Sequence, residues 1–425
     1  MIKHLQAVLA FLARTTLSRY APKIVAVAGS VGKTSTTRAV TATLARSFST
    51  RGSVKNHNNE IGVPLTILGE PKSGGRSPFA WAAILWRGFR LAFGPTQAYP
   101  NVLVLEMATD HPGDLEYLAS IAPPDVSVLT AIAEEHTEFL GDLDGVAKEE
   151  GMIVRALREH GTAVLNGDDS RVAALVSDAP RAVVFGFGEG ANVRAERVEP
   201  ELALGTVFTR FDLVVDGHRY PVNLPNALGD GNVYAALAAA SVALAFHVDP
   251  AVIPYGLAEY QPPPGRLRVL PGIKDTMLID DTYNSSPRAA ELALKTFQRL
   301  PLRSNGRRVA VLGDMLELGA LTEDAHYRVG QLAANSGIEW LIGVGPSSAV
   351  LCRGAREAGM ADERVFHFKN SQEAGQFLQE RAHAGDLILI KGSQGIRTEK
   401  IVKEMMAEPE RAEELLVRQS KDWLN

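Results

Sequence analysis

The sequence feature that most constrains the fold is a run of small apolar residues that breaks into a glycine turn. Residues 25–37 read VAVAGSVGKTSTT, so a buried strand is followed by Gly-Ser-Val-Gly-Lys-Thr and then by helix-forming residues. A strand, a glycine turn and a helix in this order direct backbone N–H groups and the positive end of a helix dipole at a phosphate. The strict pattern has one more glycine, at the position of Val27. The turn therefore predicts a shortened phosphate-binding loop.

The side chains of this turn fit a nucleotide phosphate. Lys33 is expected to neutralise β- and γ-phosphate oxygens, and the Thr34 hydroxyl is expected to bind Mg²⁺. A plain strand-to-helix turn is the alternative explanation. The nucleotide-binding residues predicted in the loop are Gly29, Ser30, Val31, Gly32, Lys33, Thr34 and Ser35.

Short runs of Val, Ile and Leu alternate with helical stretches along the rest of the chain. This alternation is typical of a mostly parallel sheet wrapped by helices. The stretch YQPPPGRL at 260–267 interrupts it with three consecutive prolines, which favours a domain junction. We therefore expect an α/β protein: an amphipathic helix at 1–23, a P-loop ATPase domain at 24–262, and a smaller Rossmann-like domain at 263–425.

Composition limits the class of protein. A chain of 425 residues fits two or three domains, and its net charge of −5 lacks the basic excess of nucleic-acid binders. A single cysteine, Cys352, excludes an internal disulfide and fits a reducing compartment. We expect a cytoplasmic monomer that does not bind nucleic acid.

Two segments, residues 1–20 and 79–93, mix apolar and basic residues. The apolar core of the first, AVLAFLA, is far shorter than a membrane span, and its apolar residues recur at helical spacing. The second contains Trp81 and Trp86. Two explanations stay open for both segments: docking on the protein's own surface, or peripheral contact with a membrane or a partner.

Two polar residues directly follow predicted strands, at the edge where open α/β sheets bind ligands. Glu106 ends the strand VLVLEM, where a carboxylate can complete Mg²⁺ coordination, and His136 follows the strand VSVLTAI. Taken singly, Glu106 also fits a solvated loop acid, and His136 also fits a structural histidine.

Further stretches add a family resemblance that extends from residue 24 to the end of the chain. The chain resembles the Mur ligases, ATP-dependent amide-forming enzymes of cell-wall precursor synthesis. Within the family it is most similar to members that add D-alanyl-D-alanine to a UDP-muramoyl-tripeptide. The family's shorter glycine loop also accounts for Val27. The stretches that carry the resemblance are GSVGKTSTT, NHNNEIGVPLTIL, VLEMATDHPGDLEYL, EEHTEFLGDLDGVAKE, PPPGRL, LIDDTYNSSP, VAVLGDMLELG and LIKGSQG.

The resemblance implies ATP and Mg²⁺ as cofactors and assigns roles to the matching residues. The implied catalytic residues are Lys33, His136 and Asp281. The implied metal ligands are Thr34, Glu106, His136 and Glu150. Nucleotide contacts outside the loop fall to Asn232, Arg266 and Asp281, and substrate contacts fall to Asn58, Asn59, Asn284, Lys391 and Ser393.

The chain also departs from the family pattern at three places. The loop begins at Gly29 with no stretch before it long enough for a separate UDP-binding domain. We therefore expect either that the chain does not recognise UDP or that residues 79–93, a partner or the membrane supply this recognition. Glu150 stands where many members have a carbamylated lysine. Three explanations stay open: Glu150 supplies a carboxylate directly, Glu150 is a helix-surface residue, or Lys148 is the modified residue. Ala235 stands where the family's adenine-reading asparagine would be, so base selectivity should weaken and Tyr234 is a substitute for stacking.

The implied chemistry is phosphoryl transfer from ATP to a carboxylate, followed by attack of an amine on the acyl phosphate. The substrates would be a carboxylate acceptor and an amino acid or dipeptide. Two alternatives stay open. The first is a related amide ligase of the folylpolyglutamate synthase or amidating type, although LIDDTYNSSP and VLGDMLELG favour the cell-wall branch over the folate one. The second is a nucleotide-binding scaffold that has lost catalysis, which Glu150 and Ala235 favour.

Overall fold

The structure is a computed structural model of the chain, and it describes residues 2–54, 57–133, 137–140, 142–203, 206–419 and 423. The chain divides into two compact units. The first contains Met1–Val198, Phe211–Asn223 and Asp230–Tyr260, and the second contains Glu199–Arg210, Leu224–Gly229 and Gln261–Asn425. The last break between the units follows Tyr260, at the start of the proline-rich stretch.

A nine-stranded sheet has the order β2-β3-β1-β4-β5-β6-β7-β8-β9. Its strands are β1 (Lys23–Ala28), β2 (Thr50–Gly52), β3 (Val102–Glu106), β4 (Val126–Leu129), β5 (Thr162–Asn166), β6 (Ala182–Gly186), β7 (Val193–Ala203), β8 (Thr206–Val215) and β9 (His218–Pro225). The pairings from β2 through β7 in this order are parallel. Because β1 lies between β3 and β4, the carboxyl ends of these three strands meet at one edge of the sheet.

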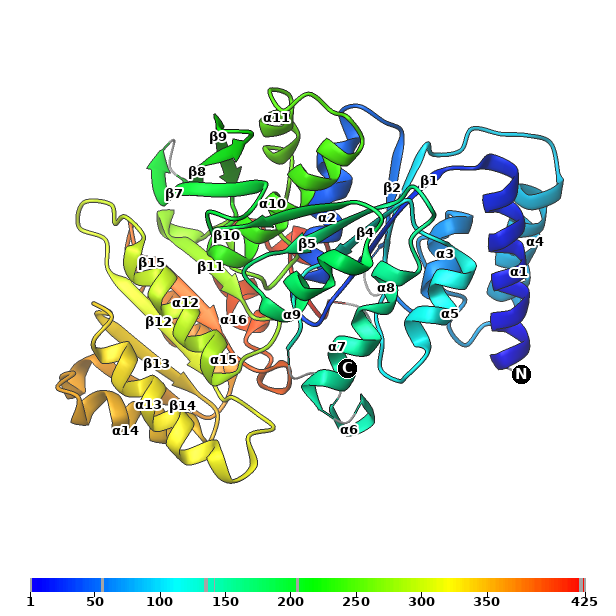
Figure 1. The fold of residues 1–425 in the computed structure, drawn as a ribbon. Coiled ribbons are helices and arrows are strands. Elements are labelled where there is room, and N and C mark those ends of the chain that lie inside the picture. The colour runs from blue at the N-terminus through cyan, green and yellow to red at the C-terminus, as the bar shows by residue number, and fades with distance from the viewer. Residues whose placement is uncertain are drawn as a thin grey trace. The chain divides into compact units, whose positions relative to one another are not determined.

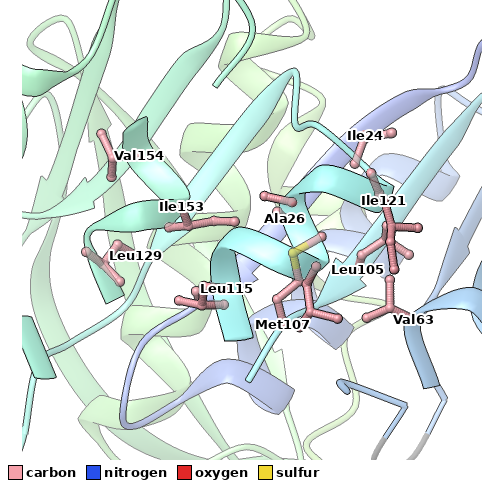
Figure 2. Close-up of a cluster of buried hydrophobic side chains, with 14 of the residues drawn as sticks. Ile24, Ala26, Val63, Leu105, Met107, Leu115, Ile121, Leu129, Ile153 and Val154 are labelled. Carbon is pink, nitrogen blue, oxygen red and sulfur yellow. The ribbon is translucent and has the colours of Figure 1, made fainter. Parts of the chain in front are cut away.

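Helices cover both faces of this parallel sheet. They are α1 (Ile2–Tyr20), α2 (Lys33–Ala45), α3 (Gly62–Leu68), α4 (Pro78–Phe93), α5 (Asp114–Ile121), α6 (Thr137–Leu140), α7 (Leu143–Glu150), α8 (Met152–Arg155), α9 (Ser170–Ala173), α10 (Asp230–Ala245) and α11 (Ile253–Leu257). On one face Ile24, Ala26 and Leu105 pack against side chains of α1, α3, α5, α7 and α8. Figure 2 shows part of this cluster, with Val63 of α3, Leu115 of α5 and Ile153 of α8 labelled. Helices α2 and α10 contact each other and the strands from the other face.

The N-terminal segment folds as the expected helix and docks within the first unit. Helix α1 contacts α3, α4 and α5. Leu9 and Leu12 of α1 lie in an apolar cluster with Leu65 of α3 and Ile84 of α4, and all four side chains are nearly or fully buried. One side of the helix therefore packs on the protein's own surface. Within the described ranges, no helix is both long enough and apolar enough to cross a membrane.

The second unit has a six-stranded sheet of order β10-β11-β15-β12-β13-β14. Strands β10 and β11 are antiparallel, and the other pairings are parallel. The strands are β10 (Arg268–Pro271), β11 (Met277–Asp281), β12 (Arg308–Gly313), β13 (Trp340–Val344), β14 (Val365–Phe368) and β15 (Leu387–Lys391). The helices are α12 (Pro287–Arg299), α13 (Thr322–Ala334), α14 (Ser348–Glu357), α15 (Ser371–Arg381), α16 (Glu399–Met405) and α17 (Ala412–Leu415).

Alternate strand residues of this second sheet point to opposite faces, as period-two side-chain geometry requires. Ala310 and Leu312 of β12 pack in one cluster with α12, α13 and α14, whereas Val309 and Val311 pack in another with α15, α16 and α17. Cys352 lies in α14, is 1% exposed, and has its thiol pKa raised to about 11 by burial, which fits packing. The expected α/β fold with two mostly parallel sheets is confirmed (Figure 1).

Candidate active site

The glycine turn after β1 has the backbone of a phosphate-binding loop. Gly29 and Gly32 have φ of 120° and 94°, a region in which residues with a Cβ are strained. A Cβ at Gly29 would lie 2.3 Å from Thr130 Oγ1, so this position also lacks the space for a side chain. Gly32 directly precedes α2, so the loop leads straight into the positive end of that helix.

Lys33 is the first residue of α2 and its side chain turns back over the loop. Its ammonium donates hydrogen bonds to the carbonyl oxygens of Gly29 and of Ser30, the latter at 3.0 Å. Both partners are uncharged, so the positive charge of Lys33 is not neutralised by them. The expected cation is therefore at the phosphate loop.

Three of the predicted side chains converge on the carboxyl end of β3. The Thr34 hydroxyl donates to Glu106 Oε1 at 3.2 Å, and Asn58 Nδ2 donates to the same oxygen at 3.1 Å. Glu106 is 3% exposed, and its backbone N–H donates to the Ser53 hydroxyl. A hydroxyl and a carboxylate beside a phosphate loop are the hard oxygen ligands that Mg²⁺ prefers.

The segment after β4 is hydrogen-bonded to the loop. The Ser30 N–H donates to the carbonyl oxygen of Ala131, and the Ala133 N–H donates to the Ser30 hydroxyl at 3.0 Å. The next residues, 134–136, lie outside the described residues, so the metal and catalytic roles of His136 stay predictions. In the described part of the chain no group of three or more His, Cys, Asp or Glu could by itself hold a metal ion.

Helix α7 ends with two consecutive buried acids, Glu149 and Glu150, which form hydrogen bonds with different elements. Glu150 Oε2 accepts a 2.7 Å hydrogen bond from the Gly29 N–H, so this carboxylate contacts the phosphate loop directly. Glu149 accepts from the N–H groups of Gly113 and Leu115, each at 3.0 Å, and so caps α5. Lys148, the alternative modified residue, is exposed. The expectation that Glu150 lies at the site fits this contact, while its role as a metal ligand stays a prediction.

Some predicted ligand residues have structural partners instead. Asn59 Oδ1 accepts from the N–H groups of Ile61 and Gly62 at the start of α3, as a helix cap does. Asn232 is 4% exposed and its Oδ1 accepts from the hydroxyl of Tyr260 at 2.6 Å. These bonds engage one acceptor atom of each amide.

Ala235 is buried in α10, so the position of the missing adenine-reading amide is filled by packing. Tyr234 is half-buried, its hydroxyl donates to Asp168 Oδ2 at 3.0 Å, and its ring packs edge-on against Phe187 at 4.8 Å. Burial and the Asp168 contact raise the pKa of Tyr234 well above its usual range. The Tyr234 side chain is therefore neutral and held in one position, as stacking on a base would require.

Sequence reasoning missed Arg38. It lies one helical turn after Thr34 on α2, where burial lowers the pKa of its guanidinium and the nearby charge of Glu106 acts in the opposite direction. The group stays cationic because an arginine guanidinium is not deprotonated in proteins. The only sequence signal was the four-residue spacing from Thr34, which places both side chains on one side of the helix.

In the second unit the tandem aspartates that end β11 also differ from each other. Asp281 forms an ion pair with Lys391 at 2.7 Å, and Lys391 also donates to the carbonyl oxygen of Asn284. Asp280 is fully buried and accepts hydrogen bonds from Gly265 and from Thr282. Burial raises the pKa of Asp280 to about 6, against these hydrogen bonds.

The other predicted residues of this unit gather around the same loop. The guanidinium of Arg266 lies 3.9 Å from the centre of the Tyr283 ring, and Asn284 is exposed. The Ser393 hydroxyl donates to the carbonyl oxygen of Ser285 at 3.1 Å and accepts from the Leu316 N–H, so it holds neighbouring loops together.

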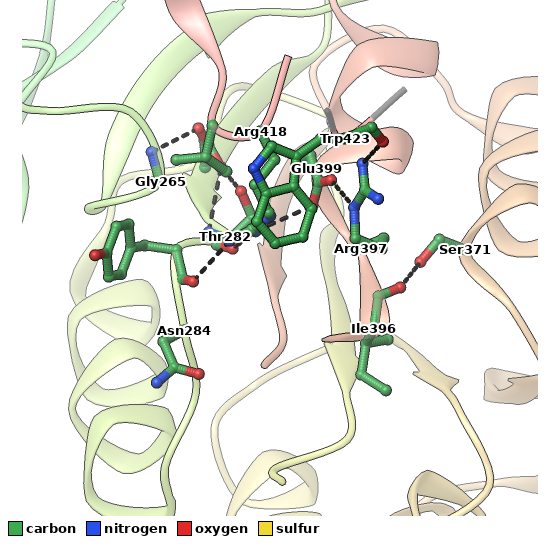
Figure 3. Close-up of polar contacts among 12 residues, drawn as sticks. Gly265, Thr282, Asn284, Ser371, Ile396, Arg397, Glu399, Arg418 and Trp423 are labelled. Carbon is green, nitrogen blue, oxygen red and sulfur yellow. Dashed lines mark hydrogen bonds and ion pairs between the residues drawn. The ribbon is translucent and has the colours of Figure 1, made fainter. Parts of the chain in front are cut away.

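An arginine near the C-terminus holds this loop in place, and no sequence pattern indicated it. Arg418 donates to the carbonyl oxygens of Thr282 and Tyr283 and pairs with Glu399 at 3.0 Å. Figure 3 shows Glu399 joined to both Arg397 and Arg418. Because Glu399 is fully buried, two cations offset the cost of burying its charge.

The first unit thus has the geometry of the P-loop nucleotide-binding proteins, in which a glycine turn between a strand and a helix presents a lysine and a hydroxyl to phosphates. The second unit adds a separate α/β sheet with its own cluster of buried charges. Two family models match the chain: the Mur ligase middle domain over residues 90–243, and the Mur ligase glutamate ligase domain over residues 265–394.

Curated relatives match over nearly the whole chain. The chain is 29% identical to the UDP-N-acetylmuramoyl-tripeptide–D-alanyl-D-alanine ligase of Bacillus subtilis (strain 168), over 94% of this chain and 79% of the relative. It is 30% identical to the enzyme of the same name from Mycobacterium tuberculosis, over 87% of this chain and 70% of the relative. The solved MurF ligase of Thermotoga maritima in complex with ADP superimposes with a TM-score of 0.73 at 26% identity, over 96% of this chain and 84% of that one. The chain belongs to the Mur ligase family.

Proposed function

We propose that this protein is an ATP-dependent peptide ligase that adds D-alanyl-D-alanine to a UDP-muramoyl-tripeptide in peptidoglycan synthesis. The observation that carries the proposal is the convergence of Thr34 and Asn58 on Glu106 beside the phosphate loop. The curated relatives that match most of the chain are named for this reaction, and one solved relative was obtained with ADP.

The reaction divides into two balanced steps. An oxygen of the tripeptide's terminal carboxylate attacks the γ-phosphorus of ATP, the bond to the bridging oxygen breaks, and ADP leaves. The product is an acyl phosphate. The amino group of D-alanyl-D-alanine then attacks the acyl carbon, an amide bond forms, and inorganic phosphate leaves with one oxygen of the original carboxylate while the amine loses a proton.

The residues of the first unit fit positioning of the phosphates. The backbone of Gly29 to Gly32 and the start of α2 would receive the phosphate oxygens. The Lys33 ammonium, which two uncharged carbonyl groups hold, would move to phosphate and offset the negative charge that develops during transfer. Glu150 would fix the start of the loop through the Gly29 N–H.

The oxygen donors beside the loop fit Mg²⁺. In proteins Mg²⁺ is bound through one or two carboxylates together with substrate phosphates and waters, so Thr34 and Glu106 are a sufficient protein contribution, with His136 and Glu150 as the further proposed ligands. When bound, the ion supplies positive charge that polarises the phosphoryl group and orients it.

For the second unit we propose the nucleotide and amine contacts. Arg266 and Asp281 would contact the nucleotide, while Asn284, Lys391 and Ser393 would contact the incoming amine or the acceptor. The exposed amide of Asn284 beside the Lys391–Asp281 pair supports this assignment. Cytoplasmic location, a monomeric state and contact of residues 1–20 and 79–93 with a membrane or partner belong to the same proposal.

A second candidate is a nucleotide-binding scaffold without catalysis, which the buried Ala235 favours. The test that separates the two is phosphate release from ATP with UDP-muramoyl-tripeptide and D-alanyl-D-alanine, compared with omission of each substrate. The ligase predicts release only when both substrates are present, together with a tripeptide product longer by two alanines. Nucleotide binding without release under any of these conditions would replace the ligase by the scaffold.

A further inference from the structure

Helices α1 and α4 lie side by side (Figure 1). Both expose aromatic side chains. Phe11 of α1 stacks on Phe93 of α4 at 6.2 Å, and Phe89 lies 5.0 Å from Phe93. Trp86 stacks on Phe89 at 6.2 Å, so the rings form one continuous surface across both helices. We call it the aromatic face. Its residues are Phe11, Phe79, Trp86, Phe89 and Phe93, which are between 50% and 88% exposed.

The opposite sides of the same two helices are buried in their shared apolar cluster. The aromatic face is therefore not the side that packs these helices onto the protein. Large rings that face water do not gain the favourable free energy of apolar burial. A contiguous group of such rings marks an interaction site. The close crossing of the helices is itself specified. A Cβ at Gly88 would lie 3.1 Å from Leu68 Cδ1 and 3.3 Å from Leu12 Cδ1, so glycine lets α4 approach both neighbours.

The charged side chains of α1 and α4 have one sign. Neither α1 nor α4 contains an acidic residue. Residues 1–105 contain thirteen Lys and Arg against two acids, Glu60 and Glu70, which gives +11; the chain's net −5 then leaves −16 for residues 106–425. Such asymmetry between parts of one chain is typical of contact with a polyanionic surface.

A basic stripe flanks the aromatic face along α4. At 100° per residue, Ala83, Arg87 and Arg90 fall between the aromatic side and the buried side of the helix. They line a cavity of about 790 Å³ together with Arg51 and Lys72.

Not all of these cations are free. Arg87 pairs with Glu70 at 2.6 Å, and Arg51 donates to carbonyl oxygens at the end of α3 and stacks on Tyr99. Within the described residues, the side chains of Lys72 and Arg90 are in no ion pair, and both are exposed. Lys72 and Arg90 are therefore the charges that remain available beside the rings.

We propose that the aromatic face docks on an anionic phospholipid bilayer, with lipid phosphates against Lys72 and Arg90. Helices that lie in a membrane interface carry aromatic and aliphatic residues on one side and Lys or Arg beside them, and they need no spanning segment. The rings would enter the headgroup region while α1 and α4 stay parallel to the membrane. This inference does not depend on the proposed ligase activity.

The test uses the full chain and sedimentation with two vesicle preparations. Vesicles with about 30% phosphatidylglycerol in phosphatidylcholine are expected to bind the protein at least about 10-fold more strongly than pure phosphatidylcholine, and high salt should reduce the difference. Free glycerol phosphate at millimolar concentration should not compete, because the proposed ligand is the lipid surface and not an isolated phosphate.

Two double variants separate the rings from the charges. Trp86→Ser/Phe89→Ser should weaken vesicle binding by more than about 10-fold. Lys72→Glu/Arg90→Glu should weaken it by about fivefold or more for each charge, and only with the anionic vesicles. The matched controls in the second unit are Leu321→Ser, whose side chain is 64% exposed, and Arg364→Glu; neither should change binding. Circular dichroism and nucleotide binding check that each variant folds.

Three results would overturn the proposal: no sedimentation with anionic vesicles, equal binding to neutral vesicles, or the same loss in the control variants. Self-association of the wild type in solution, abolished by Trp86→Ser/Phe89→Ser and accompanied by no vesicle binding, would assign the aromatic face to contact between two copies of the chain instead. Competition by free glycerol phosphate would assign the basic cavity to a soluble phosphate ligand.

Discussion

The candidate site of the first unit and the polar cluster of the second hold their charges in different ways. In the first, uncharged backbone carbonyl groups hold the Lys33 ammonium. In the second, ion pairs hold the charged side chains: Asp281 pairs with Lys391, and Glu399 pairs with two arginines. A charge held by dipoles keeps its net charge, whereas an ion pair is internally neutral. The first arrangement suits binding of a charged ligand, and the second suits fixing a loop.

Two lysines, one in each unit, give the largest expected effects. Lys33→Ala should lower phosphate release by about 10³-fold and leave the fold intact, because the side chain is only half-buried and offsets charge mainly during transfer. Lys391→Ala should instead cost about 3–5 kcal/mol of stability, because it leaves Asp281 buried without its cation. Initial rates and urea denaturation measure the two quantities.

The control for Lys33 is Lys148→Ala on the exposed side of α7, which should change neither quantity. Normal turnover of Lys33→Ala would refute the phosphate-loop assignment. A stable Lys391→Ala protein would show that the second cluster is not held by its ion pairs, and the contrast between the units would fail.

The tandem acids of α7 test the same contrast on a finer scale. Glu150→Ala removes the acceptor of the Gly29 N–H and should lower activity by about 10- to 100-fold, the range for residues that orient a site. Glu150→Gln keeps an acceptor oxygen, so it should lower activity less and raise the magnesium requirement if the carboxylate also binds the ion. Magnesium titrations of both variants measure this, and an unchanged magnesium dependence in Glu150→Gln would remove the residue from the metal site.

Glu149→Ala is the matched control because it changes the neighbouring buried acid. It removes the cap of α5 and should cost about 1–2 kcal/mol of stability with little change in the rate at low temperature. If Glu149→Ala and Glu150→Ala lowered activity equally, the separate roles of the two acids would be wrong.

The last prediction concerns the pH dependence of stability at Asp280. Its pKa is raised on folding to about 6 by burial, so between about pH 4 and pH 6 the folded state binds the proton more tightly than the unfolded chain does. The contribution of Asp280 to stability therefore falls as the pH rises through this window, by up to about 3 kcal/mol. Asp280→Asn should remove that dependence.

Urea denaturation of both proteins at the two ends of the window measures the difference. The stability of the wild type relative to Asp280→Asn should decrease from the acidic to the neutral end. A constant difference would mean that the carboxyl group does not titrate there.

The sequence predicted those parts of the site that local patterns determine. A strand, a glycine turn and a helix predicted the phosphate loop, and the end of the next strong strand predicted Glu106; both lie at the sheet edge where parallel strands end. Three consecutive prolines predicted a domain junction, and the last break between the compact units lies just before them, after Tyr260; the boundary at 262/263 stays a prediction. These features depend on residues close together in the sequence and on a general property of parallel sheets.

Other assignments depended on tertiary contacts that a sequence pattern does not contain. Glu149 and Glu150 are neighbours on one helix, and only the packing of α7 decides that one meets α5 and the other meets the loop. Asn59 has the residue type of a ligand but caps α3. Arg418 reaches the loop after β11 from more than a hundred residues away. The resemblance identified Glu150 and Asn59 without indicating their partners, and it identified neither Glu149 nor Arg418.

The central claim is that a carboxylate is activated through an acyl phosphate. It is tested most directly by synthesising the muramoyl-tripeptide with oxygen-18 in both oxygens of its terminal carboxylate and analysing the products by mass spectrometry. Activation through an acyl phosphate predicts one labelled oxygen in each phosphate released and one retained in the new amide. Phosphate without label, released at the same rate as the amide forms, would contradict it.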